Sequence, residues 1–140
     1  MSVSSYGGAR AGRLDLIKQV FTFLCVGGFA TALHYALMFA LMHLFDWTPV
    51  PASTAGFLTS AVVNFALNAR FTFKSKRSVL HTAPRFAVVA ATGLLLNRYV
   101  LALLLSLDVR VFIGQIVATL CVLSWNYIIN ALWTFKAKPG

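Results

Sequence analysis

The chain has 140 residues, which is enough for one domain. Hydrophobic residues make up 59% of it and charged residues only 11%, a composition too apolar for a soluble domain of this size. The formal net charge of +9 does not indicate a nucleic-acid partner, because the basic residues flank long apolar runs instead of lining a soluble element. We therefore expect an all-α, polytopic membrane protein.

The N-terminal part of the chain divides into a polar tail and a long apolar run. Residues 1–19 are small, polar and basic, and we expect this tail to be mobile or to lie on the membrane surface. The run over 21–44 exceeds the roughly 20 residues of a spanning helix, is too long for the apolar part of a signal peptide, and should be retained. A small-residue face that allows a close helix contact recurs every four residues along it, at Gly28, Ala32, Ala36 and Ala40.

Three further apolar runs follow, separated by a two-proline turn, a basic segment and a second tight turn. They predict spans over about 51–73, 84–107 and 111–135. The expected organisation is thus a cytoplasmic basic tail, a four-helix membrane domain over 20–136, and a short tail over 137–140.

The second and fourth spans close on the same pattern. N-F-A-L-N-A-R-F-T-F-K begins at Asn64, and N-Y-I-I-N-A-L-W-T-F-K begins 62 positions later. The segment ending at His34 aligns with the segment ending at Asn97, at an offset of 63. Each unit holds two spans, so both units have the same orientation. The sequence predicts two parallel-repeat helical hairpins, at about 20–74 and 85–136.

The distribution of positive charge predicts the orientation in the membrane. The N-terminal tail carries three Lys/Arg, the segment between the hairpins five and the C-terminal tail two, whereas the two outer turns share only Arg110. By the positive-inside rule, both termini and the middle segment are cytoplasmic.

Two pairs of asparagines lie near the predicted cytoplasmic ends of the second and fourth spans. The two members of each pair are four residues apart and so lie on one face of their helix. In one interpretation they bond between helices or cap helix ends, a contribution of about 0.6 kcal/mol per interhelical bond. In the other, amides bind sugar hydroxyls while nearby cations neutralise a phosphate. The candidate substrate-binding residues here are Asn64, Asn68, Arg70, Lys74, Asn126 and Asn130.

Arg98 lies about 13 residues into the third span, roughly 20 Å deep. Such a position costs about 2.5 to 3.5 kcal/mol by insertion scales, so the guanidinium needs a partner. We expect Arg98 to face the bundle interior or a lateral groove with Asn97 and His34, where it would meet a passing phosphate. The alternatives are that Arg98 extends to the outer headgroups and that His34 is a packed, hydrogen-bonded residue.

Several kinds of chemistry are missing from the sequence. All three acids, Asp15, Asp46 and Asp108, lie at the ends of spans, which argues against a proton-coupled exporter of the small four-helix type. No catalytic Ser/His/Asp set, metal-ligand spacing or phosphate-binding glycine loop is recognisable, so we expect no enzyme, no metal and no cofactor. Cys25 and Cys121 fall inside apolar runs and should be free thiols.

Three motifs resemble a known family: F-x-x-V-G-G-x-x-T, V-V-N-F-x-L-N-x-R-F-T-F and W-N-Y-x-x-N-x-x-W-T-F. Over 21–135 they are similar to the GtrA-like family of small four-helix membrane proteins. The resemblance implies a bacterial cytoplasmic membrane location and a role in cell-surface polysaccharide synthesis, with undecaprenyl phosphate or a related polyprenyl phosphate as sugar carrier. One departure is Ala90-Ala91, where the first span has Gly-Gly.

Our first hypothesis is a facilitator that flips a polyprenyl-phosphate-linked monosaccharide from the cytoplasmic to the outer leaflet. Without a coupling group, the movement would be driven by consumption of the sugar on the far side. The alternative is a non-transporting anchor or assembly partner of a polyprenyl-phosphate glycosyltransferase. Four helices leave little room for a path around a sugar, so we expect a homodimer or a hetero-complex.

Overall fold

The computed structural model describes residues 5–71 and 76–136, and within them the chain forms four α-helices and no strand. The helices are α1 (Ser5–Leu44), α2 (Pro49–Phe71), α3 (Lys76–Ser106) and α4 (Val111–Lys136). Each contains a segment long and apolar enough to cross a membrane. The prediction of an all-α, multi-pass membrane protein is therefore confirmed.

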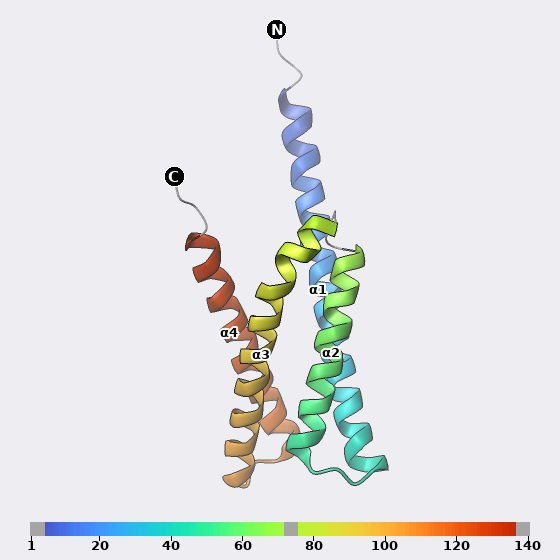
Figure 1. The fold of residues 1–140 in the computed structure, drawn as a ribbon, viewed down its shortest axis with the longest axis vertical. Coiled ribbons are helices and arrows are strands. Elements are labelled where there is room, and N and C mark those ends of the chain that lie inside the picture. Colours follow the sequence, from blue (N-terminus) through green and yellow to red (C-terminus); the bar gives the residue numbers. More distant parts are fainter. Residues whose placement is uncertain (1–4, 72–75, 137–140) are drawn as a thin grey trace.

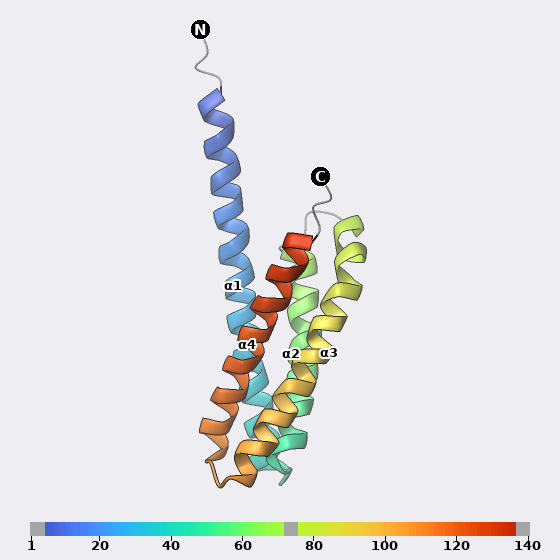
Figure 2. The same ribbon diagram turned by 90° about the vertical axis from the view of Figure 1, so that its left-hand side faces the viewer.

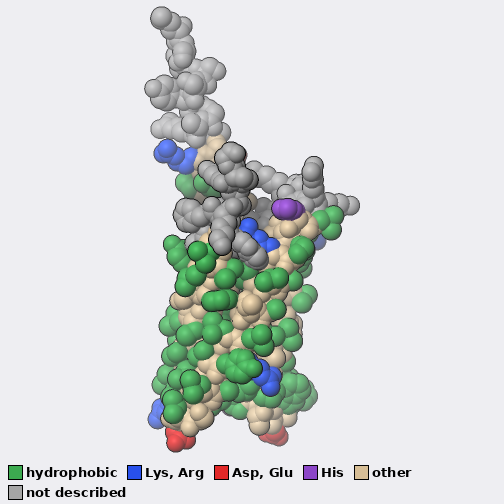
Figure 3. Space-filling model, turned by 60° about the vertical axis from the view of Figure 1, so that its left-hand side comes forward, with side chains coloured by type: hydrophobic (Ala, Val, Ile, Leu, Met, Phe, Trp, Pro, Cys, Tyr) green, Lys and Arg blue, Asp and Glu red, His purple; other side chains and the backbone are tan. Residues whose placement is uncertain are grey.

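The four helices form two hairpins that pack side by side. α1 packs against α2, α3 against α4, and the hairpins meet through α2 and α3. Both hairpin turns lie at one end of the bundle, and the N-terminal end of α1 extends beyond the other helices at the opposite end (Figures 1 and 2). On the face shown in Figure 3, most side chains between the ends of the bundle are hydrophobic, and acidic side chains lie at the hairpin end. This distribution fits a bundle surrounded by lipid.

The duplication seen in the sequence is also present in the packing. Inward-facing positions of α1 correspond to those of α3 at an offset of 63, and those of α2 to α4 at 62. The buried pairs are Ala30/Gly93, His34/Asn97, Met38/Leu101, Ala52/Gly114, Ser53/Gln115, Gly56/Ala118 and Ser60/Val122. The turns match as well: Asp46 (φ 55°) and Asp108 (φ 59°) both adopt the left-handed conformation that aspartate tolerates.

Three helices begin earlier than predicted, α2 by only two residues and α1 and α3 by more. α1 starts at Ser5 instead of near residue 21, so residues 5–19 belong to the same helix as the first span, and their location relative to the membrane stays a prediction. The segment R-L-D-L-I-K-Q in this region consists mostly of good helix formers and extends the spanning helix without a break. α3 starts at Lys76 and includes Pro84, which was expected to open the span. Proline removes one backbone hydrogen bond, and α3 changes direction in its N-terminal part (Figure 1).

The hydrophobic core lies toward the hairpin end and takes one residue from each helix: Met38, Ala52, Leu101 and Ala118. The close contact between α1 and α2 is made by Gly56, where an added Cβ would lie 2.7 Å from the carbonyl oxygen of His34. The small-residue face predicted on α1 does not make this contact. Its Gly28 has open space around it, and Ala32 and Ala36 are exposed.

Candidate substrate-binding site

Four polar side chains, one from each helix, meet in the interior of the bundle. Ser53 of α2 donates to Gln115 Oε1 of α4 at 2.6 Å, and Asn97 Nδ2 of α3 donates to Ser53 Oγ at 2.9 Å. Gln115 Nε2 donates to Asn97 Oδ1 at 2.9 Å and closes a ring of three residues. His34 Nε2 of α1 lies 3.1 Å from Ser53 Oγ. We call these four residues the polar ring.

The hydrogen-bond directions around Ser53 assign the proton on the histidine. The single hydroxyl proton of Ser53 goes to Gln115, so the serine oxygen can only accept from Asn97 and from His34. His34 therefore carries its hydrogen on Nε2. Ser53 is not a nucleophile activated by His34, since activation would need an Nε2 that accepts.

The polar ring joins equivalent positions of the two repeats. Ser53 and Gln115 occupy equivalent positions 62 residues apart, and they contact each other directly. At the edge of the ring, Tyr35 Oη lies 2.7 Å from Thr119 Oγ1 and so joins α1 to α4.

Further amides continue from the ring toward the end that holds the chain termini. Asn126 comes first: its Oδ1 would lie 3.7 Å from a Cβ on Gly93, which is one turn from Asn97 on α3. Asn64 and Asn68 follow on α2, and Asn68 Nδ2 donates to Asn64 Oδ1 at 2.9 Å. Asn68 is only 3% exposed. Along α2, Asn68 lies 15 residues, or roughly 22 Å, from Ser53.

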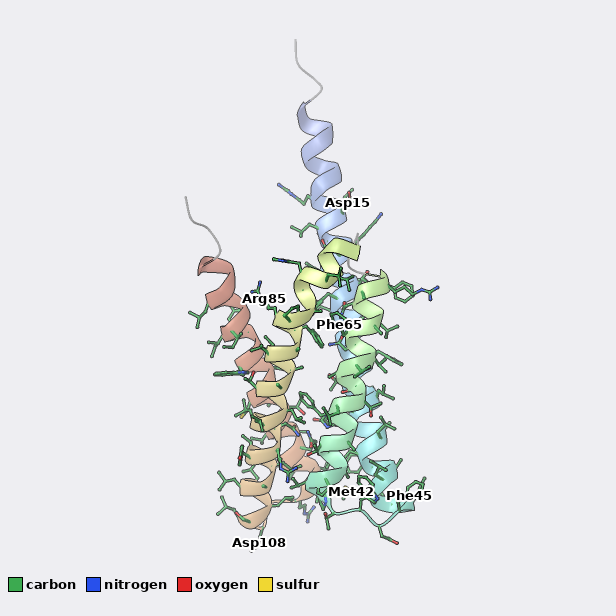
Figure 4. The ribbon with its side chains drawn as sticks, in the orientation of Figure 1. Asp15, Met42, Phe45, Phe65, Arg85 and Asp108 are labelled. Carbon is green, nitrogen blue, oxygen red and sulfur yellow. The ribbon has the colours of Figure 1, made fainter. Side chains whose placement is uncertain are left out.

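Arg85 adds a cation to this series. It is half-buried, with its Nε atom buried, and lies on α3 near the end that holds the termini (Figure 4). Thr92, two helical turns away on the same side of α3, accepts a hydrogen bond from Trp125 Nε1 of α4 at 2.9 Å. Arg85 therefore lies on the side of α3 that faces α4. The amides, Arg85 and the polar ring together form what we call the polar ladder.

Arg98 does not belong to the bundle interior, so that part of its prediction is wrong, whereas its placement in a lateral groove between helices stays a prediction. Its side chain is exposed, whereas the preceding residue Asn97 is 1% exposed. Successive residues of an α-helix point about 100° apart, and Asn97 shares the inward stripe of α3 with Gly93 and Leu101. Arg98 consequently lies on the outer surface of α3, beside the level of the ring.

The remaining predicted residues have less structural support. Arg70 is exposed, and its guanidinium carbon lies 5.7 Å from the ring centre of the adjacent Phe71. Lys74 lies outside the described residues, as does the side chain of Asn130. Cys25 and Cys121 are free thiols, as predicted.

Ser53 is not among the substrate-binding residues predicted from the sequence. Two signals point to it: it is the repeat counterpart of Gln115, and it lies one helical turn before Gly56 on the small and polar stripe of α2. In the part of the chain that the structure describes, no group of three or more His, Cys, Asp or Glu side chains could hold a metal ion.

Comparison with known proteins adds two similarities. A sequence profile described as the transmembrane domain of GtrA/DPMS matches residues 22–135. The chain is also 25% identical, over 129 residues, to the cell wall teichoic acid glycosylation protein GtcA of Listeria monocytogenes. The aligned region covers 89% of each of the two proteins. No solved structure matches the chain significantly.

Proposed function

Since the chain belongs to the GtrA/DPMS transmembrane-domain family, we propose that it moves a polyprenyl-phosphate-linked monosaccharide from the cytoplasmic to the outer leaflet. The observation that carries this proposal is the polar ladder, which runs through the bundle from Asn68 to the ring around Ser53. Amides and hydroxyls can donate to and accept from each hydroxyl of a sugar. The name of the Listeria relative supports a role in glycosylating a cell-surface polymer.

We assign the parts of the lipid-linked sugar to different surfaces. The polyprenyl chain stays in the surrounding lipid, and the sugar follows the ladder between the repeats. Arg98, on the outer surface of α3 beside the ring, binds the phosphate as it passes, because a guanidinium can bind phosphate oxygens in pairs. Arg85 and the Asn64–Asn68 pair receive the headgroup at the cytoplasmic end.

Two features complete the proposal. In the described parts of the four spans the one carboxylate, Asp15, lies near the projecting N-terminal end of α1, so we infer that consumption of the sugar in the outer leaflet drives the movement. A single bundle of four helices offers little room around a sugar. A homodimer or a complex with a membrane glycosyltransferase would supply the remaining wall of the path.

Reconstituted vesicles test the proposal. Undecaprenyl-phosphate-linked glucose is placed in both leaflets and oxidised by external periodate, which does not cross the bilayer. We expect the protected inner-leaflet fraction to be consumed in vesicles with the protein and to persist in vesicles without it. Persistence of that fraction in both would rule out the transport function.

One observation favours the second candidate, an anchor or assembly partner of a glycosyltransferase. The N-terminal part of α1 extends beyond the other helices (Figure 2), and its Leu14, Leu16 and Ile17 are more than half exposed. Exposed apolar residues on a projecting helix suit contact with another protein. In the vesicle assay, an anchor would leave the inner-leaflet fraction unchanged but would raise the activity of a co-reconstituted glycosyltransferase.

A further inference from the structure

The polar ring joins the two repeats near the hairpin turns. Ser53 belongs to the first repeat, and its partners Asn97 and Gln115 belong to the second. All three side chains are at most 1% exposed. The repeats therefore cannot separate at this end without breaking the ring.

Apolar layers enclose the ring on both sides. Met38 and Leu101 follow His34 and Asn97 by one turn toward the hairpin end. On the other side, Phe57 and Val122 converge on Gly93, where an added Cβ would meet them at 3.4 and 3.3 Å. Broken ring bonds would leave donors and acceptors in an apolar environment, which is strongly unfavourable unless new partners replace them.

We propose that the ring is a sugar-responsive latch. Hydroxyl groups of the sugar replace the hydrogen bonds between the ring residues, and this replacement lets the two repeats separate at the hairpin end. The proposal rests on the transport function proposed above and assigns a residue-level role to the ring. A sugar hydroxyl both donates and accepts, as Ser53 does, and two neighbouring hydroxyls match the paired donor and acceptor of an amide. The ring thus stays closed when empty and opens for a ligand that replaces its bonds.

The chemistry of the ring also selects the class of sugar. Its four members carry amides, a hydroxyl and an imidazole, and none carries a carboxylate or a permanent cation. The nearby guanidinium of Arg98 lies on the outer surface of α3. A sugar carboxylate entering the ring would lose its water without gaining a counter-charge. The latch therefore opens for an uncharged sugar and not for a uronic acid.

Thiol labelling of the ring tests the latch independently of transport. The variants Ser53→Cys and Ala118→Cys are made in a Cys25→Ala, Cys121→Ala background and reconstituted. Ala118 is fully buried one turn from Gln115, so Ala118→Cys leaves the ring intact. A small water-soluble methanethiosulfonate is applied with undecaprenyl phosphate, with its glucose conjugate or with its glucuronic acid conjugate. The matched control is Ser60→Cys, since Ser60 is buried on the same helix but donates its hydrogen bond to the backbone oxygen of Phe57 in its own helix.

We expect the glucose conjugate to accelerate labelling of both ring reporters at least fivefold. Undecaprenyl phosphate, the glucuronic acid conjugate and the Ser60→Cys control should each give changes below twofold. Equal acceleration by all three lipids, or none by the glucose conjugate, overturns the latch. Acceleration by the glucose conjugate without transport in the periodate assay would instead keep the latch and remove the transport function.

Discussion

Asn97 and Arg98 are consecutive residues of α3 that lie in different environments: Asn97 is hydrogen-bonded to Ser53 and Gln115 inside the bundle, and Arg98 is exposed on its outer surface. The 100° turn between neighbouring helix positions produces this separation. One short stretch of α3 thus presents a neutral amide to the interior and a cation to the lipid side at nearly the same depth. A lipid-linked sugar has a matching division, because the sugar is uncharged and its phosphate carries the charge opposite to that of Arg98.

This relationship makes the role of Arg98 testable. Arg98→Leu should lower vesicle transport at least tenfold, because it removes the proposed phosphate contact. The protein should remain as stable or become more stable, since a leucine avoids an insertion cost of about 2.5 to 3.5 kcal/mol. Arg98→Lys keeps the charge but loses paired bonding to phosphate and should also impair transport. Thermal unfolding in detergent and the periodate assay measure the two effects, and a fully active Arg98→Leu would contradict the assignment.

Alanine variants of Asn64 and Asn68 should distinguish a role of this pair in substrate binding from a role in stability. Asn68 is 3% exposed, so Asn68→Ala removes a buried amide and should lower the free energy of unfolding by about 1 to 3 kcal/mol. Asn64 is half-buried, and Asn64→Ala leaves its backbone carbonyl in place as an acceptor for Asn68. Asn64→Ala should therefore reduce transport or lipid binding while the protein keeps its normal elution volume in detergent. Loss of folded protein in Asn64→Ala would assign the pair a purely structural role.

Gly56 offers a test of the packing between α1 and α2. In Gly56→Ala the new Cβ would lie 2.7 Å from the backbone oxygen of His34, and backbone atoms cannot move aside as a flexible side chain can. We expect destabilisation of about 1 to 3 kcal/mol in detergent unfolding. Gly28→Ala is the matched control, because that position is open and alanine favours the helix by up to about 1 kcal/mol. Equal stability of the two variants would place the α1–α2 contact elsewhere.

The orientation in the membrane is testable with reporter fusions. The C-terminal end of α2 and the N-terminal end of α3 lie at the same end of the bundle as the N-terminal part of α1 (Figure 1). Lys and Arg residues flank these helix ends in the sequence. A reporter active only outside the cytoplasm should be silent when fused after Lys138 and active when inserted near Trp47. The reverse pattern would invert the proposed direction of transport.

Much of the architecture follows from the sequence by itself. The lengths of the apolar runs predict four spans, and the repeat at offsets of 62 and 63 predicts which positions of the two hairpins correspond. These properties are local or periodic, so they can be read without knowing which helices touch. The same reasoning placed His34 and Asn97 as counterparts of similar depth, and the structure brings both to Ser53.

Only the tertiary structure decided which way individual side chains point. Hydropathy along a spanning helix does not distinguish lipid from protein interior, because both are apolar, and the small-residue face of α1 and the inward orientation of Arg98 were predicted incorrectly for that reason. The importance of Ser53 was likewise invisible, since a serine in a span often bonds to its own helix, as Ser60 does. Ser53 differs because the packing of the two repeats brings Gln115 Oε1 within 2.6 Å of its hydroxyl, a contact between residues 62 positions apart.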